Sequence, residues 1–142
     1  MIFAVDTNVL VDLWAGVPDG SVAARDALRM ALAAGKLVIC APVYAELIAG
    51  PSFQGDRVEG LLNRAGIEID WEMGESVWRL AGQAFAGYAG RRRSAGAGGP
   101  RRPLTDFVVG AHAVLTAGKM ITRDSGLYRA AFPRLELIVP GQ

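Results

Sequence analysis

Short apolar segments alternate with segments of helical periodicity along almost the whole chain, and this alternation constrains the fold more than any other feature. Buried strands are expected at five apolar runs: Ile2–Val5, Leu37–Cys40, Ile67–Ile69, Lys119–Thr122 and Leu135–Val139. Apolar residues at helical spacing predict helices at Asn8–Trp14, Ser21–Ala34, Pro42–Ala49, Asp56–Ala65, Glu75–Tyr88, Leu104–Leu115 and Leu127–Phe132. Strands that alternate with helices favour an α/β domain with a mostly parallel sheet.

Residues with known positional preferences mark several of the expected helix ends. Asp6 or Thr7 should cap the first helix. Ser21 should cap the second helix, which Gly35 ends. Pro42 stands where proline favours the start of a helix.

The chain has the length of one domain, and we expect residues 1–142 to form it. Apolar residues make up 51% and charged residues 20%, which is typical of a globular protein. The longest stretch without an ionised side chain is Phe107–Gly118, whereas a membrane-spanning helix needs about 20 apolar residues. No secretory signal is expected, because Asp6 interrupts the first apolar run. The single cysteine, Cys40, excludes an internal disulfide and a cysteine-based zinc site, and a reducing cytoplasm is the simplest location.

Residues 91–102 differ in composition from the rest of the chain. They contain five arginines and four glycines or prolines but no acidic residue, although the net charge of the whole chain is only +1. We expect this segment to form a flexible basic loop.

Four of the 14 acidic residues stand at special places relative to the expected elements. Asp6 ends the first strand, and Asp124 follows the fourth. Glu46 lies one turn into the helix after the second strand, and Asp106 lies in the first turn of the helix after the arginines. In parallel sheets the carboxyl ends of the strands share one edge, so we expect all four acids there. Taken singly, each could instead cap a helix or face its dipole.

Four carboxylates at one edge would repel one another, by about 4 kcal/mol for a pair 4 Å apart at an effective dielectric of 20. Neither of the two lysines, Lys36 and Lys119, is an obvious partner. A cation would relieve the repulsion, and oxygen-only ligands favour Mg²⁺ or Mn²⁺. Such a cation activates water and orients it toward a phosphodiester. The residues therefore predict metal-dependent phosphoryl chemistry.

The segments that contain these acids resemble the PIN domain family. They are Asp6-Thr7-Asn8-Val9-Leu10, Tyr44-Ala45-Glu46-Leu47, Leu104-Thr105-Asp106-Phe107 with Gly110-Ala111-His112-Ala113, and Ile121-Thr122-Arg123-Asp124 with Tyr128 and Phe132-Pro133. More narrowly, the set resembles the VapC-type ribonuclease toxins of prokaryotic toxin–antitoxin pairs. The similarity covers essentially the whole chain. The segment 91–102 is longer and more basic than is usual in the family, and Ser125 stands where some members carry a further acid.

The resemblance implies a three-layer α/β/α sandwich and a Mg²⁺- or Mn²⁺-dependent endoribonuclease. Asp6 and Asp106 match the positions that bind metal most directly, and Glu46 and Asp124 would act through water or on a second ion. A metal-activated water would attack the scissile phosphate and leave 5′-phosphate and 3′-hydroxyl ends.

The resemblance also implies supporting residues and partners. Thr122 matches a hydroxyl that hydrogen-bonds the first acid, and Asn8 matches a polar residue at the edge of the site. The implied partners are RNA, a VapB-like antitoxin and a second copy of the chain. Five arginines could bind RNA phosphates or an acidic segment of the antitoxin: Arg91, Arg92, Arg93, Arg101 and Arg102. Alternatively, their segment is a solvated linker.

Two other classes of protein remain open. A haloacid-dehalogenase-like phosphatase also begins with a strand and an Asp, but it needs a second Asp where this chain has Asn8. A catalytically silent PIN-like module would only bind a partner, and the presence of all four acids argues against it. The only histidine, His112, lies about 120° around the helix from Asp106, so packing beside Val108 is favoured over acid–base catalysis.

Overall fold

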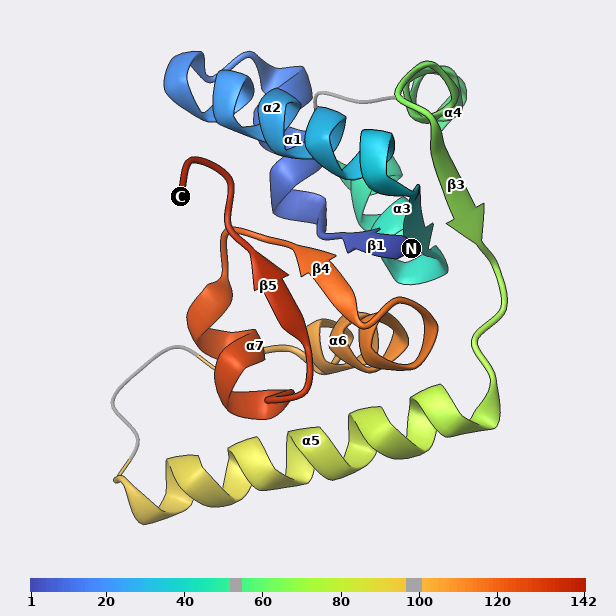
Figure 1. Ribbon diagram of the computed structural model, residues 1–142. Helices are drawn as coiled ribbons and strands as arrows, with labels where there is room; N and C mark the ends of the chain where they lie inside the picture. The colour runs from blue at the N-terminus through green and yellow to red at the C-terminus, as the bar shows by residue number, and fades with distance from the viewer. Residues whose placement is uncertain (52–54, 97–100) are drawn as a thin grey trace.

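Five strands form one sheet at the centre of the molecule (Figure 1). The computed structural model describes residues 1–51, 55–96 and 101–142. The strands are β1 (Ile2–Val5), β2 (Lys36–Cys40), β3 (Ile67–Asp70), β4 (Lys119–Ile121) and β5 (Glu136–Ile138). Their order in the sheet is β3-β2-β1-β4-β5, and each of these neighbouring pairs is parallel. The prediction of an α/β domain with a parallel sheet is confirmed.

Helices cover both faces of this sheet. Within the described residues they are α1 (Thr7–Ala15), α2 (Pro18–Ala34), α3 (Ala41–Ala49), α4 (Gly55–Arg64), α5 (Glu75–Ser94), α6 (Leu104–Thr116) and α7 (Ser125–Ala131). Figure 1 shows α1 and α2 on one side of the sheet and α5, α6 and α7 on the other. The chain crosses from β1 toward β3 in one direction and then returns toward β5, and right-handed crossovers place the two sets of helices on opposite faces. The expected three-layer α/β/α sandwich is confirmed.

The core lies on both sides of β1, the central strand. Its last three residues, Phe3, Ala4 and Val5, are all buried, as expected for a strand covered on both faces. Buried apolar residues of α1 and α6 complete the packing against it, among them Leu10 and Phe107. None of the helices in the described part of the chain combines the length and the apolar character needed to cross a membrane.

The start of α2 differs from the prediction. Ser21 does not cap this helix, which begins at Pro18 with Val17 as the N-cap residue. Proline is well suited to the first position of a helix, because its missing N–H would have no partner there. Ser21 therefore lies in the first turn, and its hydroxyl donates a hydrogen bond to the carbonyl oxygen of Leu13 at 3.2 Å.

The basic segment 91–102 also differs from the prediction, because its first part is helical. α5 continues to Ser94, so Arg91, Arg92 and Arg93 form its last turn and not a flexible loop. Arginine is a good helix former, and positive charge at the carboxyl end of a helix interacts favourably with its dipole. Gly96, with a φ of +68°, follows the end of the helix. Residues 97–100 of the expected loop lie outside the described residues.

Candidate functional site

The crevice beyond the carboxyl ends of β1 and β4 is the place where such a sheet binds ligands. The chain leaves β1 toward β2 and later returns to β4 on the other side of β1, which makes a topological switch point there. Val5 pairs with Ile121, so the residues that follow them lie next to each other. The N–H of Asp6 donates to the carbonyl oxygen of Ile121 at 3.0 Å, which joins the residue after β1 to the end of β4.

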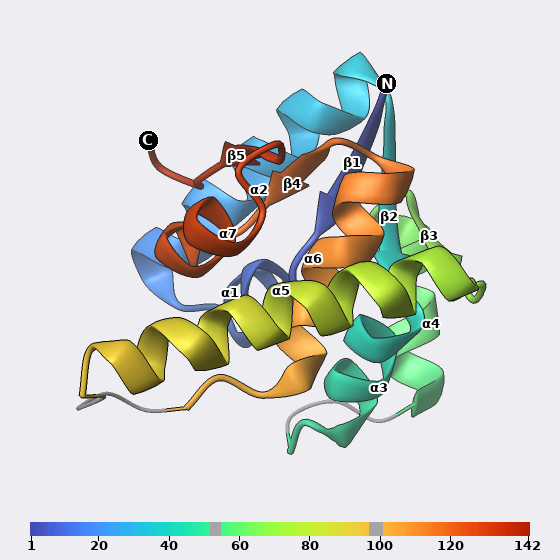
Figure 2. The same cartoon turned by 90° about the horizontal axis from the view of Figure 1, so that it is seen from below.

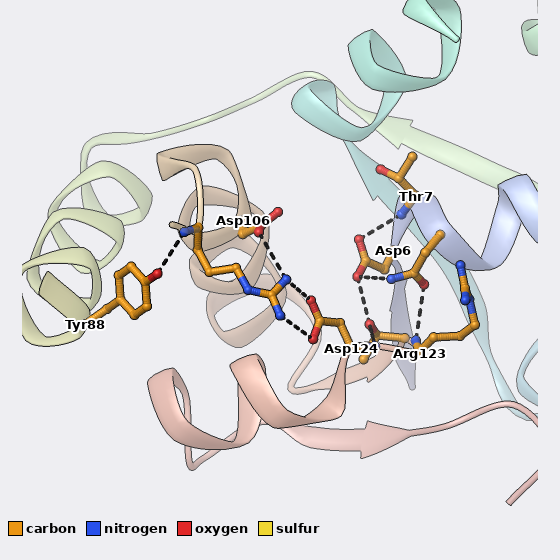
Figure 3. A network of polar contacts seen from close by, with 9 residues as sticks. Asp6, Thr7, Tyr88, Asp106, Arg123 and Asp124 are labelled. Atoms are coloured by element: carbon orange, nitrogen blue, oxygen red, sulfur yellow. Dashed lines mark hydrogen bonds and ion pairs between the residues drawn. The ribbon is translucent and has the colours of Figure 1, made fainter. Parts of the chain in front are cut away.

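Asp6 is the most buried of the four acids singled out above, with 8% of its surface exposed. It is the N-cap residue of α1, and its Oδ1 accepts a hydrogen bond from the N–H of Thr7 at 2.8 Å. Its Oδ2 accepts from the Thr122 hydroxyl at 2.7 Å and from the Asn8 amide at 3.1 Å. The expected hydrogen bond between Thr122 and Asp6 is therefore present, and three donors fix this carboxylate (Figure 3).

Asn8 and Arg123 connect this carboxylate to α1 and to the residues after β4. The Asn8 side-chain oxygen accepts a hydrogen bond from the N–H of Arg123 at 3.2 Å. The Arg123 guanidinium forms an ion pair with Asp12 of α1, with Nε 2.6 Å from Oδ2. Asn8 is thereby held with its amide nitrogen toward Asp6 and its oxygen toward Arg123.

Glu46 reaches the same place from α3. Its Oε1 accepts a hydrogen bond from the Thr7 hydroxyl at 3.2 Å. Thr7 also donates its N–H to Asp6, so this one residue joins the two carboxylates. The helix that follows β2 thus brings Glu46 to the switch point, as its place in the sequence predicts.

Asp124 and Asp106 are joined through an arginine. Both terminal nitrogens of Arg102 contact the Asp124 carboxylate, at 2.6 and 3.2 Å. One of them also lies 4.0 Å from Oδ2 of Asp106, in the first turn of α6. The N–H of Asp124 donates to the Thr122 hydroxyl at 2.9 Å, and this hydroxyl in turn donates to Asp6.

One network of contacts therefore includes all four acids, which we call the carboxylate cluster: Asp6, Glu46, Asp106 and Asp124. Figure 3 shows the part of this network around Asp6, Asp106 and Asp124. The bidentate pairing of Arg102 with Asp124 is the contact that sequence reasoning missed. The spacing of four residues indicates a contact between Arg102 and Asp106, but nothing local indicates the pairing with Asp124.

The charges of the carboxylate cluster shift the pKa values of its members. Burial, followed by the negative charge of Asp6, raises the pKa of Asp106 to about 6. Burial also raises the pKa of Asp6, against the lowering effect of the hydrogen bonds from Thr122 and Thr7. Burial by neighbouring groups, together with the charge of Asp6, raises the pKa of Glu46. The cluster therefore concentrates negative charge that is costly to hold without a positive partner.

The donor chemistry of the carboxylate cluster fits Mg²⁺ or Mn²⁺, because its charged ligands are all carboxylate oxygens and they destabilise one another. As the side chains stand, however, no three Asp, Glu, His or Cys residues among those described are grouped so that they could hold a metal ion. The position of Arg102 provides a physical reason, since its guanidinium occupies both oxygens of Asp124. A cation that used Asp124 would need this ion pair to open.

Tyr128 lies beside the carboxylate cluster and was not predicted as a site residue. It is 1% exposed, and its pKa is raised by burial and then by the charges of Asp6, Asp106 and Asp124. Its phenol therefore stays protonated at neutral pH.

His112 lies outside the carboxylate cluster. It is 1% exposed, and its Nε2 lies 2.8 Å from Oδ2 of Asp70, at the end of β3. The hydrogen bond to His112 lowers the pKa of Asp70. This pair joins α6 to the edge of the sheet, in agreement with the structural interpretation of the histidine.

The five arginines of segment 91–102 line two adjoining hollows beside the cluster. One hollow, of about 420 Å³, is lined by Phe85, Tyr88, Ala89, Arg92, Arg93, Arg101 and Arg102. The other, of about 320 Å³, is lined by Tyr88, Arg91, Arg92, Arg102, Leu127 and Ala130. Arg102 belongs to both hollows and also to the contacts of the carboxylate cluster.

Solved structures with the same fold come from toxin–antitoxin complexes. VapBC2 from Rickettsia felis, bound to a DNA fragment from its promoter, aligns with a TM-score of 0.70 at 20% identity over 98% of both chains. VapBC-1 from nontypeable Haemophilus influenzae aligns with a TM-score of 0.67 at 18% identity over 100% of both chains. A toxin–antitoxin complex from Klebsiella pneumoniae aligns with a TM-score of 0.60 at 20% identity over 98% of both chains. At these identities the likeness shows the fold.

Sequence comparison identifies the family. A search of curated protein sequences found no match. The sequence profile of the PIN domain, however, matches residues 3–133, which include every member of the carboxylate cluster. This chain therefore belongs to the PIN domain family.

Proposed function

We propose that this protein is a Mg²⁺- or Mn²⁺-dependent endoribonuclease and the toxin of a VapBC-type toxin–antitoxin pair. The observation that carries this proposal is the convergence of Asp6, Glu46, Asp106 and Asp124 on the switch point of a PIN domain sheet. Family membership argues against the phosphatase alternative, and the cluster supports an enzyme over a silent binding module.

Each residue of the site has a role in this proposal. Asp6 and Asp106 hold the cation directly, whereas Glu46 and Asp124 act through water or on a second ion. When bound, the cation activates water for attack on the phosphate and stabilises the charge that develops there. The part played by the chain is orientation: three hydrogen bonds fix the Asp6 carboxylate, and the Thr122 hydroxyl links it to the backbone of Asp124.

Cleavage of RNA by the purified protein tests the proposal. The wild-type protein should cut single-stranded RNA with Mg²⁺ or Mn²⁺, leave 5′-phosphate ends, and lose activity in EDTA. Asp6→Asn and Asp106→Asn should each lower the rate at least about 100-fold, since each removes a charged oxygen from the cation. Asp26→Asn, on the exposed surface of α2, is the matched control and should cut at the wild-type rate.

Activity that persists in EDTA, or in both variants, would remove the metal-dependent mechanism. A folded protein that cuts no RNA with either cation would favour the silent binding module. Circular dichroism of each variant separates loss of activity from loss of fold.

We also propose an antitoxin partner and a homodimer, both in the cytoplasm. The similar structures are complexes of toxins with antitoxins, which supports the first. Exposed apolar side chains on α2 support a protein interface, notably Met30, which is 76% exposed. Co-expression with the product of an adjacent short gene, followed by size-exclusion chromatography, should give one complex with inhibited ribonuclease activity. Two separate, unchanged peaks would contradict the antitoxin proposal.

A further inference from the structure

The two arginine-lined hollows beside the carboxylate cluster form a feature that the cleavage mechanism does not use. We call them together the arginine pocket, and they share Tyr88, Arg92 and Arg102. They are enclosed by the last turns of α5, by Arg101 and Arg102 before α6, and by α7. Figure 2 shows the C-terminal half of α5 passing α7 and the start of α6.

The charge of the arginine pocket points to an anionic ligand. Five guanidinium groups line it, and no acidic residue is among the described residues that line either hollow. Positive charges gathered in one place repel one another, and an anion relieves that repulsion. Phosphate is the anion that planar guanidinium groups bind best, through paired hydrogen bonds.

The walls of the arginine pocket favour a nucleotide over an acidic protein segment. The partly buried Phe85 and Tyr88 pack on the buried Phe107 ring, each with ring centroids 5.2 Å from it, and the Arg92 guanidinium lies 5.8 Å from the centre of the Tyr88 ring. Aromatic and guanidinium surfaces next to phosphate-binding groups are typical of sites for single-stranded nucleic acid. A glutamate-rich segment would use the charges but not the rings.

Arg102 places this ligand next to the carboxylate cluster. Its N–H donates to the Tyr88 hydroxyl at 2.8 Å, so its backbone is fixed at the wall of the pocket. Its guanidinium, in contrast, reaches Asp124, and the Arg102 side chain is 39% exposed. A phosphate in the pocket and Asp124 would therefore compete for the same guanidinium.

We propose that the arginine pocket binds a phosphate of the RNA strand beside the cleaved bond, and that Arg102 couples this phosphate to the carboxylate cluster. The identity of the ligand rests on the proposed ribonuclease function. When the guanidinium turns to the phosphate, both oxygens of Asp124 become available to a cation. Coupling between two ligands is reciprocal, so RNA and the cation each favour the binding of the other.

RNA binding without metal tests the pocket. Fluorescence anisotropy of a labelled single-stranded RNA is measured in EDTA over a range of salt concentrations. The double variant R92Q/R93Q should bind at least about tenfold more weakly, and its log–log salt slope should be shallower by roughly 0.7, because loss of the one phosphate contact removes about that much. R79Q is the matched control, since Arg79 lies on the same helix and lines neither hollow.

If the double variant and R79Q have the same affinity for RNA and the same salt slope, the proposal that the arginine pocket binds RNA is wrong. The same holds if a glutamate-rich peptide binds through Arg92 and Arg93 while RNA does not, since the ligand would then be an acidic protein segment. Because this binding needs no cation, its result separates the two proposals. If the wild-type protein cleaves RNA but the double variant binds RNA unchanged, only the pocket proposal is rejected. If RNA binding depends on the arginines but the wild-type protein does not cleave RNA, only the ribonuclease proposal is rejected.

Metal affinity without RNA tests the coupling. Calorimetric titration with Mn²⁺ should give about tenfold tighter binding for R102Q than for the wild-type protein, because the guanidinium no longer competes for Asp124. R102K, which keeps the charge but loses the paired contact, should fall between them. Unchanged or weaker Mn²⁺ affinity in a folded R102Q protein would overturn the coupling.

Discussion

Asp106 shows how burial and neighbouring charges make a single ionised side chain costly. Its carboxylate lies in the first turn of α6, close enough to Asp6, Glu46 and Asp124 for their charges to raise its pKa, after burial, to about 6. Arg102 offsets only part of this effect from 4.0 Å. A negative charge at this position is therefore costly in the protein without metal.

We predict that the metal-free protein becomes less stable as the pH rises from about 4 to about 7. The folded protein keeps a proton on Asp106 up to a pKa of about 6, whereas the unfolded chain releases it near 3.8. The folded state therefore binds more protons in this range, and stability falls as pH increases. The raised pKa values of Asp6 and Glu46 act in the same direction. Thermal unfolding in EDTA at several pH values measures the trend, and a melting temperature that rises across this range would contradict it.

Asp106→Asn should make the metal-free protein more stable at pH 7, by about 2 kcal/mol, and should flatten this pH dependence. The asparagine carries no charge to bury, and among the described residues the Asp106 carboxylate makes an ion pair at 4.0 Å but no hydrogen bond. Urea unfolding in EDTA gives the free energies. A loss of stability in this variant would show that the charge of Asp106 supports the fold.

The sequence allowed the four acids to be predicted but not their arginine partner. Asp6 follows β1 directly and Asp124 comes three residues after the end of β4, so their place at the sheet edge follows from local pattern alone. The contact between Arg102 and Asp124 joins residues 22 positions apart and depends on how α5, α6 and α7 pack. The pairing of His112 with Asp70, 42 positions apart, was beyond local pattern for the same reason.

At the scale of elements, α6 carries Asp106 and depends on a close contact with the segment after α7. Gly110 faces the ring of Phe132, which is 3% exposed, and a Cβ at this position would overlap that ring. The glycine therefore sets how near α6 can lie to this part of the core. Helix propensity alone would favour alanine by about 1 kcal/mol, so packing decides the residue type here.

Gly110→Ala should destabilise the protein by about 2 kcal/mol, since overpacking costs more than the gain in helix propensity. Gly82→Ala on α5 is the control, because a Cβ there meets nothing within 4 Å. That variant should be neutral or slightly more stable. Equal effects of the two substitutions in urea unfolding would show that the contact with Phe132 does not limit the packing of α6.

Most elements could be predicted from periodicity, and the errors have local causes. β1, β2 and β4 could be predicted because each is a short apolar run that is largely buried, whereas the edge strands β3 and β5 are only partly buried. The end of α5 was missed because a run of charge between glycines is typical of a loop. The helix continues through Arg91–Arg93 because arginine suits a last turn. These residues are therefore helical, and they line the arginine pocket.

At the scale of the whole molecule, the strand order is what gathers the site. In the order β3-β2-β1-β4-β5, the second and third strands lie on one side of β1, and the fourth and fifth lie on the other side. Residues from both halves of the sequence therefore meet beyond the end of β1. The carboxylate cluster takes one acid after β1, one from α3, one from α6 and one after β4. The arginine pocket lies next to it, so negative and positive regions meet at Arg102.

The central claim is that these four carboxylates, distant in the sequence, together form one site for a divalent cation. Calorimetric titration of the purified, metal-free protein with Mn²⁺ at pH 7 tests it most directly, with Asp106→Asn and Asp26→Asn as the paired variants. The account predicts saturable binding by the wild-type protein and by Asp26→Asn, and at least about tenfold weaker binding by Asp106→Asn. Mn²⁺ affinity that is the same in all three proteins, or absent from the wild-type protein, would contradict it.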